Sequence, residues 1–419
     1  MPVYDALRRW CNQLLASLLV CGWLLALVAC TSPAATSTLP PAPYFSATDV
    51  SMDSPTDGWS VGTWVTPGRT SDATTATPAM AHFQDGQWRL APISVAANLG
   101  PYESYHLVRM LSPTDGWATT QGAIYHYDGV HWRVAHPASD SIRIADLQMY
   151  SRAIGWAVGS DGVLQYTHGD WVNVTTSLPP PPSDWQANWA YPGLRSVAIA
   201  SPTDVWAMGD GGVIWHYDGT AWRSIVSPYF PNRFYTSASV DGYPASGANL
   251  ANFAAAGHNF EALYASQLLS STLGWSVGGA TLAPSSMDWG PAVVEEYQNG
   301  SWQIIHIMTR DHATGAPYKE PVLYTLAAIS AQESWIGGAW ARPTLVGSGD
   351  APPVEGNPTY APLLLHYHAG QWTFVSAPAV GAIHRLVMFG PNEGWAAADG
   401  GLLHYASGQW RLVKVSPAG

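Results

Sequence analysis

The fold is decided by residues 194–225, which read LRSVAIASPTDVWAMGDGGVIWHYDGTAWRSI. Short apolar runs alternate there with turn sequences, and these runs cover residues 194–200, 205–208, 213–217 and 221–225. Pro202 supplies the fixed φ of a tight turn, while 209–212 and Asp218-Gly219 are hairpin sequences. The stretch therefore predicts four short antiparallel strands joined by tight turns.

The same unit recurs seven times along the chain, and each copy contains two tryptophan motifs. The first motif, of the SPTDGW type, ends at Trp59, Trp117, Trp156, Trp206, Trp275, Trp335 and Trp395. The second motif ends at Trp88, Trp132, Trp171, Trp222, Trp302, Trp372 and Trp410. Five residues before the second tryptophan there is always an aromatic residue: Phe83, Tyr127, Tyr166, Tyr217, Tyr297, Tyr367 and Tyr405. Repetition of a four-stranded unit at this spacing is typical of a β-propeller.

The spacing of the repeats gives the number of blades. Successive first-motif tryptophans are 39 to 69 residues apart, and a hidden extra blade would need about twice the shortest spacing. The sequence therefore predicts an all-β fold, a seven-bladed β-propeller with four antiparallel strands per blade, over residues 44–419. The ring should begin with an inner strand near Phe45 and end with an outer strand near Val415. We expect no strand to cross the closure, so side-chain packing should join the last blade to the first.

The composition limits the possible functions. The chain has 419 residues, a net charge of −12, 11% charged residues and 22 tryptophans. Its apolar and aromatic content excludes a disordered chain. Lys319 and Lys414 are its two lysines, and an acidic protein so poor in cations is unsuited to nucleic acid, whose phosphates must be neutralised. We expect a monomer that binds no nucleic acid and needs no cofactor.

Residues 1–29 have the layout of an export signal. Arg8-Arg9 precede an uncharged apolar run over residues 14–29, which is short for a membrane-spanning helix. The sequence LVAC at residues 27–30 resembles the lipobox of bacterial lipoproteins. The resemblance implies cleavage before Cys30, a diacylglycerol on its sulfur, and lipid anchoring on the extracytoplasmic side of the cell membrane. The alternatives are an ordinary secretory signal or an uncleaved anchor in which Cys30 is incidental.

Residues 30–43 are rich in Ser, Thr and Pro and predict an extended tether between the membrane and the propeller. The three cysteines, Cys11, Cys21 and Cys30, all lie within the first thirty residues. The predicted propeller can therefore form no disulfide and no thiolate metal site.

Two sets of polar residues recur with the blades. A histidine precedes the repeated aromatic residue at His82, His126, His216, His366 and His404. Because these histidines are distributed one per blade around a ring, we predict packed or hydrogen-bonded side chains and no metal site. Asp57, Asp115 and Asp204 lie in first-motif turns, and we interpret them as turn residues.

The two motifs together resemble a known family. A Gly-Trp followed by a small residue, and a later Tyr-Asp-Gly before tryptophan, resemble the sialidase/BNR-like superfamily, including the photosystem II stability/assembly-factor type. The resemblance covers about residues 45–415 and implies a propeller fold without specifying an activity. The Asp-box of that superfamily has aspartate five residues before the tryptophan, where this chain has an aromatic residue. A kelch-like relationship therefore stays open.

A sialidase-like glycoside hydrolase or lyase is the alternative function that this resemblance allows. It implies an active site with clustered arginines, a tyrosine nucleophile with a glutamate partner, and an aspartate acid. Residues of suitable type on or near the predicted inner strands are Arg109, Arg143, Arg195, Arg385, Asp49, Asp146 and Glu261. The chain lacks the FRIP-type motif of those enzymes. A cluster of arginines and carboxylates at the channel mouth would favour the enzyme, and an aromatic surface would favour a binding protein.

The connections between strands favour the binding protein. Six long inserts fall on one face of the ring by strand parity, which we call the insert-bearing face: 63–79, 175–193, 227–260, 280–291, 307–321 and 339–362. The opposite, tight-turn face should offer little relief. Aromatic residues of the inserts either bind a ligand or pack on one another, and the ligand-binding candidates are Trp185, Trp189, Tyr235, Tyr243, Trp289 and Trp340. We interpret the protein as a membrane-anchored binding or assembly module for a protein or glycan partner.

Overall fold

The computed structural model describes residues 42–68, 73–92, 104–137, 142–160, 162–179, 193–210, 212–225, 261–280, 292–308, 320–346 and 354–417. The chain divides into two compact units, Pro43–Thr66 with Thr75–Gly419, and Met1–Ala42 with Pro67–Thr74. The first unit is the propeller, and most of the second lies outside the described residues. Within the described part, no helix combines the length and the hydropathy that crossing a membrane requires.

The described strands form seven sheets, and each contains four consecutive antiparallel strands. Blade one contains β1 (Tyr44–Ser54), β2 (Asp57–Thr66), β3 (Thr75–Gln84) and β4 (Gln87–Leu90). Blade two contains β5 (Leu107–Ser112), β6 (Asp115–Thr119), β7 (Ile124–Tyr127) and β8 (Trp132–His136). Blade three contains β9 (Ile144–Ser151), β10 (Ile154–Gly159), β11 (Gly162–Thr167) and β12 (Asp170–Asn173), followed by the 3₁₀ turn η3 (Thr175–Ser177).

The remaining blades repeat the pattern, with longer strands in blades five and six. Blade four contains β13 (Leu194–Ser201), β14 (Asp204–Gly209), β15 (Ile214–Tyr217) and β16 (Trp222–Ile225). Blade five contains β17 (Glu261–Ser270), β18 (Leu273–Ala280), β19 (Ala292–Gln298) and β20 (Ser301–Met308). Blade six contains β21 (Glu320–Ser330), β22 (Glu333–Val346), β23 (Val354–His368) and β24 (Gln371–Phe374). Blade seven contains β25 (Ile383–Gly390), β26 (Glu393–Ala398), β27 (Gly401–Ala406) and β28 (Gln409–Val413).

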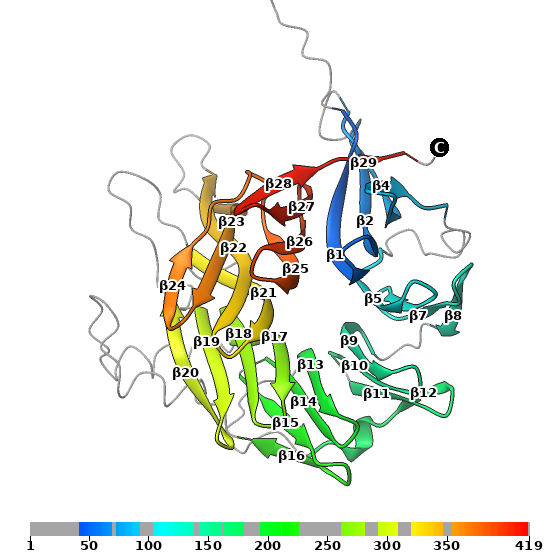
Figure 1. Ribbon diagram of the computed structural model, residues 1–419, viewed down its shortest axis with the longest axis vertical. Helices are drawn as coiled ribbons and strands as arrows, with labels where there is room; N and C mark the ends of the chain where they lie inside the picture. Colours follow the sequence, from blue (N-terminus) through cyan, green and yellow to red (C-terminus); the bar gives the residue numbers. More distant parts are fainter. Residues whose placement is uncertain are drawn as a thin grey trace, which may run out of the picture. The chain divides into compact units, whose positions relative to one another are not determined.

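The sheets are arranged as a ring around their first strands. These inner strands contact one another in the cyclic order β1, β5, β9, β13, β17, β21 and β25, and β25 contacts β1 again. In Figure 1 the inner strands surround the centre, and outer strands such as β8, β16 and β24 lie at the rim. The predicted seven-bladed β-propeller with four strands per blade is therefore confirmed.

The closure of the ring differs from the prediction. After β28 the chain forms β29 (Val415–Ser416), which pairs in parallel with β4 of blade one. Val415 lies opposite Trp88 and is buried among residues of blades one and seven. The expectation that no strand crosses the closure is wrong, because the C-terminal segment adds a fifth strand to blade one. Two residues are too few for a periodic pattern to reveal.

The hydrophobic core of the described residues is divided among the seven junctions between blades. In each junction, the first-motif tryptophan of one blade packs against the second-motif aromatic residues of the next blade. Trp206 of blade four lies 4.8 Å from Tyr297 and 5.8 Å from Trp302 of blade five, between ring centroids. Trp395 packs in the same way against Trp88, which closes the series. Because tilted and edge-on aromatic pairs are favourable, the repeated tryptophans join the blades to one another.

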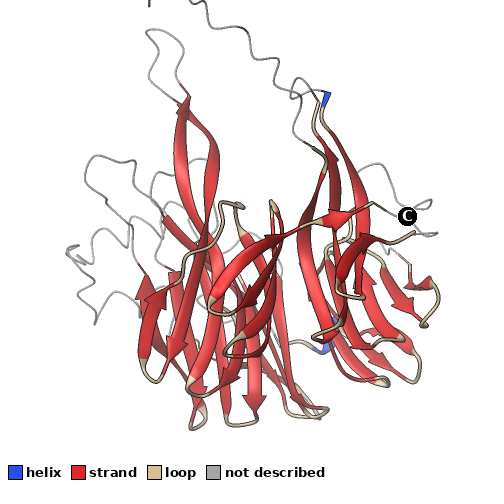
Figure 2. Ribbon diagram, turned by 45° about the horizontal axis from the view of Figure 1, so that its top comes forward, coloured by secondary structure: helices blue, strands red, loops and turns tan. Residues whose placement is uncertain are grey.

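Two of the predicted inserts are partly regular strand. β2 and β3 pair as far as Thr66 opposite Thr75, and β22 and β23 pair as far as Val346 opposite Val354. Both are connections between second and third strands, and Figure 2 shows both hairpins extending on the same side of the propeller. Inserts 63–79 and 339–362 are therefore extended hairpins rather than loops over most of their length, because Thr and Val recur there and favour strands.

Candidate functional site

A ladder of hydrogen bonds joins the inner strands of neighbouring blades. In this ladder, a polar side chain on one inner strand accepts a bond from a backbone N–H of the next. The bonds run from the N–H of Val108 to Asp49, Met110 to Ser51, Val197 to Asp146, Ile199 to Gln148, Ser266 to Ser196, Ala328 to Gln267 and Leu386 to Thr325, at 2.8 to 3.1 Å. Blade one is thereby linked to blade two, and blades three to seven are linked in series.

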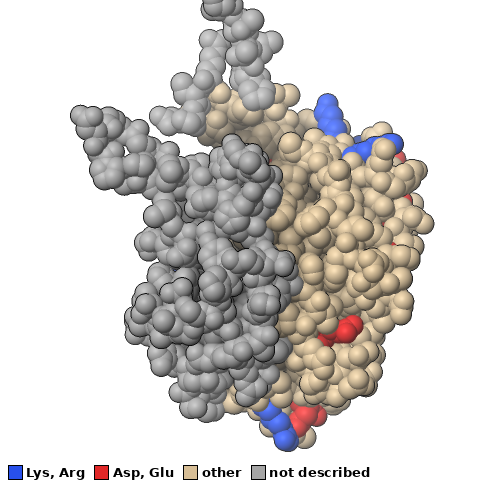
Figure 3. Space-filling model, turned by 90° about the vertical axis from the view of Figure 1, so that its left-hand side faces the viewer, with Lys and Arg blue, Asp and Glu red and all other residues tan. Residues whose placement is uncertain are grey.

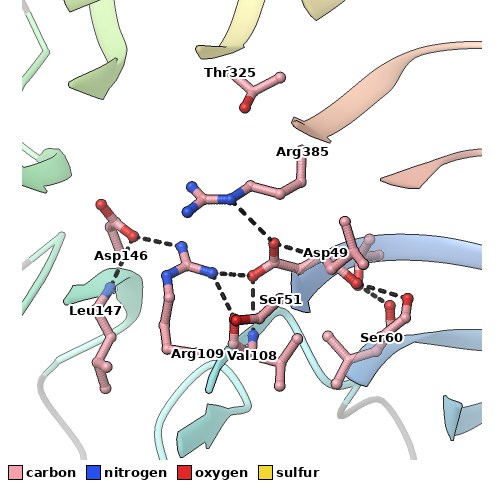
Figure 4. Close-up of polar contacts among 12 residues, drawn as sticks. Asp49, Ser51, Ser60, Val108, Arg109, Asp146, Leu147, Thr325 and Arg385 are labelled. Carbon is pink, nitrogen blue, oxygen red and sulfur yellow. Dashed lines mark hydrogen bonds and ion pairs between the residues drawn. The ribbon is translucent and has the colours of Figure 1, made fainter. Parts of the chain in front are cut away.

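Arginines occupy the two junctions where the described residues show no bond of this ladder. Arg109 of blade two donates from Nη2 to Oδ1 of Asp146 in blade three at 2.9 Å, and it also forms an ion pair with Asp49. Arg385 of blade seven lies with its Nε 3.6 Å from Oδ1 of Asp49 in blade one. Figure 4 shows these two guanidinium groups facing the two carboxylates. Ion pairs thus replace the ladder between blades two and three and between blades seven and one.

The carboxylates of this central cluster, which comprises Asp49, Arg109, Asp146 and Arg385, are held by structural bonds. Asp49 is 2% exposed, and it accepts the N–H groups of Val50 and Val108, each at 2.9 Å. Asp146 also accepts two backbone N–H groups, at 2.9 and 3.0 Å. Two cations and two anions leave the cluster without net charge, and both carboxylates are fixed as acceptors.

The two arginines of the central cluster differ in how well their charges are compensated. Burial lowers the pKa of Arg109, but the attraction of Asp49 and Asp146 outweighs it and raises that pKa above its ordinary value. Burial and then repulsion by Arg109 lower the pKa of Arg385. The buried Nε of Arg385 meets no hydrogen-bond acceptor among the described residues. Arg385 therefore carries the less compensated of the two positive charges.

A β-bulge recurs in six inner strands of the described chain, eleven residues before the first-motif tryptophan. The bulged residues are Thr48, Ala145, Arg195, Tyr264, Tyr324 and His384. A bulge sets two residues opposite one on the partner strand and re-aims a side chain. Because each inner strand starts at the insert-bearing face, the bulges lie near that end of the inner strands.

Four of the bulged residues form a continuous row, which we call the rim arc: Arg195, Tyr264, Tyr324 and His384 of blades four to seven. The ring centroids of Tyr264 and Tyr324 are 5.6 Å apart, and those of Tyr324 and His384 are 6.0 Å apart. The electrostatic interaction with Tyr264 also contributes to raising the pKa of Arg195. All four side chains remain partly exposed. The rim arc thus presents two phenol rings between a guanidinium and an imidazole.

Carboxylates hold both ends of the rim arc. Arg195 donates from Nε and Nη2 to Asp210 at 2.8 and 3.2 Å, and Nε2 of His384 lies 2.6 Å from Oδ1 of Asp399. Burial raises the pKa of Asp399, but the hydrogen bond and charge of His384, together with the N–H of Ala382, outweigh it and lower that pKa overall. Burial raises the pKa of Tyr324, so its hydroxyl stays protonated. The arrangement offers hydrogen-bond donors and aromatic faces rather than an activated nucleophile.

Four of the seven candidates for a hydrolase site come together, and the other three lie elsewhere. Arg109, Arg385, Asp49 and Asp146 come together in the central cluster, and Arg195 joins the rim arc. Arg143 is exposed, and the side chain of Glu261 lies outside the described residues.

The structure describes one of the aromatic ligand-binding candidates. Trp340 lies in β22, partly buried against the core between blades five and six, with its ring 5.9 Å from that of Phe374. The other candidates lie outside the described residues: Trp185, Trp189, Tyr235, Tyr243, Trp289 and the lipidation candidate Cys30. Sequence reasoning missed Tyr264, Tyr324 and His384, although their shared position before the tryptophan could have grouped them.

The recurring histidines pair with the recurring acids. Each ring lies 4.0 to 4.5 Å from the first-motif tryptophan of its own blade. Each Nε2 contacts the carboxylate two residues before that tryptophan at 2.5 to 3.2 Å, in the pairs His82–Asp57, His126–Asp115, His216–Asp204, His366–Glu333 and His404–Glu393. The prediction of hydrogen-bonded histidines is confirmed. The interpretation of Asp57, Asp115 and Asp204 as turn residues was incomplete, because each also contacts the histidine of its blade. In blade six a second histidine, His368, makes a group that could hold a metal ion.

A cavity of about 280 Å³ lies between blades one and two. Its lining includes Trp59, His82, Arg89, Tyr127, Val130 and His131. Val130 and His131 belong to a turn between third and fourth strands, so the tight-turn face has more relief here than the sequence predicts.

The fold and these sites define a seven-bladed β-propeller built from internal repeats. No protein-family model matches the chain, and no curated protein matches its sequence. Among solved structures, YCF48 bound to D1 peptide is 14% identical, with a TM-score of 0.50 over 88% of this chain and 96% of that one. YCF48 from Cyanidioschyzon merolae is 13% identical, with a TM-score of 0.49 over 88% and 97%. The WD40 repeats of RRP9 are 9% identical, with a TM-score of 0.50 over 90% and 97%. At these identities the similarity establishes the fold alone.

Proposed function

We propose that this protein is a binding or assembly module that recognises a protein partner at the rim arc. The observation that carries the proposal is the row of Arg195, Tyr264, Tyr324 and His384, which β-bulges present at one end of the inner strands. Tyrosine and arginine are among the side chains that contribute most to protein interfaces. A partly exposed row of these types, contributed by four successive blades, suits a peptide segment or a loop of a partner.

One similar structure supports a protein partner. One similar structure is described as YCF48 bound to D1 peptide, so a propeller of related architecture occurs with a bound peptide. The described surface in Figure 3 has few charged side chains. The edge of the propeller in that view, which carries the outer strands of blades five and six, offers little charge for long-range steering of a partner.

Membrane anchoring is the second part of the proposal and rests on the lipobox-like sequence before Cys30. A lipid on Cys30 would hold the module at the extracytoplasmic surface, with the tether allowing the insert-bearing face to meet its partner. The substitution Cys30→Ser should abolish lipidation, because the thioether needs the thiol. Detergent phase partitioning measures this: the parent should enter the detergent phase and the variant the aqueous phase. If both stay aqueous, the anchor is absent.

A sialidase-like hydrolase is the rival function, and the bonding of the central cluster disfavours it. Asp49 and Asp146 each accept two backbone N–H groups and an arginine, so neither is available to move a proton. A tyrosine nucleophile must be activated by a base or a lowered pKa, whereas burial raises the pKa of Tyr324. We therefore expect no turnover of fluorogenic sialosides by the full chain.

The binding proposal is tested by capture from envelope extract, followed by affinity measurement with the captured partner. Arg195→Ala and Tyr264→Ala should each weaken binding more than ten-fold, about 1.4 kcal/mol. Asp128→Ala, in a turn of the tight-turn face, is the control and should bind like the parent. A partner that protects residues 112–117 and 126–132 from hydrogen exchange, and leaves the rim arc unchanged, would contradict the proposal. A glycan array run with the same variants separates a glycan partner from a protein.

A further inference from the structure

Blade six differs from the other blades by a second histidine beside its repeated acid. The position after the repeated aromatic residue is His368 in this blade, and it is Gln84, Asp128, Thr167, Asp218, Gln298 and Ala406 in the others. Glu333 consequently contacts two imidazoles, with Oε1 2.5 Å from Nε2 of His366 and Oε2 2.6 Å from Nδ1 of His368. Where the other blades of this type have one acid paired with one histidine, blade six has Glu333 paired with both His366 and His368.

The strand pairing brings the three side chains to one side of the sheet. Glu333 is the first residue of β22 and lies directly opposite His368 on β23. His366 and His368 are two residues apart on one strand, so they share a face. The potential ligand atoms of all three residues lie within 4.8 Å of one another.

We propose that Glu333, His366 and His368 bind a divalent transition metal ion of the zinc class. Two imidazole nitrogens and one carboxylate are the ligands of many three-residue zinc sites, whereas Mg²⁺ and Ca²⁺ prefer oxygen ligands alone. Ligand atoms about 2.0–2.1 Å from a tetrahedral ion lie about 3.3 Å from each other. The two contacts of Glu333 would need to widen by less than an ångström. Ligand atoms separated by as much as the 4.8 Å limit would need to approach by about 1.5 Å, and the largely exposed His368 can supply that movement.

Two of the three ligands are already fixed by the fold. The ring of His366 stacks on Trp335 with centroids 4.3 Å apart and planes 17° from parallel, and the side chain of Glu333 is only 9% exposed. The side chain of His368 is 70% exposed, so the group is accessible to solvent on that side. A water or a side chain of a bound partner would complete the site.

Blade seven contains a matched control within the same molecule. Glu393 and His404 form the same pair at 2.6 Å, and His404 stacks on Trp395 at 4.3 Å. Ala406 lies opposite Glu393, in the register that His368 has in blade six. Blade seven thus has two of the three ligands in the same geometry, and Ala406→His should supply the third.

The test is titration of the full chain, without a histidine tag, with Zn²⁺ by calorimetry and with Co²⁺ by visible absorption. The parent should bind one tightly held ion, and Mg²⁺ should not compete for it. His368→Ala should weaken binding at least about ten-fold, since even loss of an outer partner of a metal ligand costs that much. His404→Ala should leave the affinity unchanged, and Ala406→His should add a second ion with its own Co²⁺ absorption.

His368→Ala removes an exposed side chain, so we expect it to change metal binding without destabilising the fold. Unchanged far-ultraviolet circular dichroism should accompany the loss of metal binding in His368→Ala. Saturable Zn²⁺ binding that is equal in the parent and His368→Ala would overturn the proposal. Absence of saturable binding in the parent would overturn it as well.

Discussion

Removal of the Asp49 carboxylate should be among the most destabilising single changes in the propeller. The side chain is 2% exposed, accepts two backbone N–H groups, and faces both Arg109 and Arg385. Removing one partner of a buried ion pair costs roughly 3–5 kcal/mol, because the remaining charge stays buried. The N–H of Val108 would also lose its acceptor, which alone costs roughly 1–3 kcal/mol. The two effects overlap, so we expect Asp49→Ala to lower the free energy of unfolding by at least about 3 kcal/mol.

A double-mutant cycle separates the ion pair from the other contacts of Asp49. Arg109→Met removes the main cation that Asp49→Ala leaves uncompensated, so the double variant should be less destabilised than the sum of the single variants. Direct contacts of this kind couple by roughly 0.5–3 kcal/mol. Urea denaturation, followed by tryptophan fluorescence, gives the free energy of unfolding of the parent, the two single variants and the double variant. Tryptophan fluorescence reports on the whole ring because tryptophans lie at every blade junction.

An exposed ion pair is the control for this cycle. Arg223 lies 2.9 Å from Asp218, and its side chain is 68% exposed. Because exposed pairs contribute little to stability, Arg223→Ala should leave the denaturation midpoint nearly unchanged. A loss below about 1 kcal/mol in Asp49→Ala, or additive effects in the cycle, would refute the role assigned to the central cluster.

Three further predictions concern the core, the closure and the pH dependence. Trp206→Ala and Trp222→Ala should each cost about 3–5 kcal/mol, because both rings are buried at blade junctions; changes within about 0.5 kcal/mol in denaturation would contradict this. Val415→Asp should lower the thermal midpoint by disrupting β29, whereas Leu412→Asp on the exposed side of β28 should not. Burial lowers the pKa of His106 below its ordinary 6.5, so the folded state favours neutral imidazole. Stability should therefore fall as the pH drops below about 6.5, and His106→Gln should reduce that loss in thermal unfolding at different pH values.

The blades could be predicted from the sequence because their signals are local and repeated. Apolar runs and turn residues set the strand boundaries of each blade, and seven copies fix the register. The partners of the tryptophans could not be predicted in the same way. Trp206 and Trp222 belong to one repeat, yet they pack in different junctions. Trp206 contacts Trp302 of the following blade, whereas Trp222 contacts Trp156 of the preceding blade.

The rim arc was not predicted, because the residue alternation within each strand does not reveal its β-bulges, and the shared position before the tryptophan was not used. A period of two places alternate residues on opposite faces, and a bulge breaks that rule at one position. Tyr264 and Tyr324 thus gave no sign in the pattern of their strands, and sequence reasoning turned instead to the inserts. His368 did give a sign, the His-x-His sequence at 366–368, but the prediction considered one histidine per blade and therefore no metal site.

The centre of the ring divides into two parts with different tasks. The central cluster joins blades seven, one, two and three, where ion pairs stand at the two junctions without a ladder bond among the described residues. The rim arc belongs to blades four to seven, four of the five blades that the ladder links in series. The proposed function assigns recognition to the rim arc and cohesion to the central cluster, so changes to Asp49 should weaken the fold, and changes to Tyr264 should weaken binding while the fold persists.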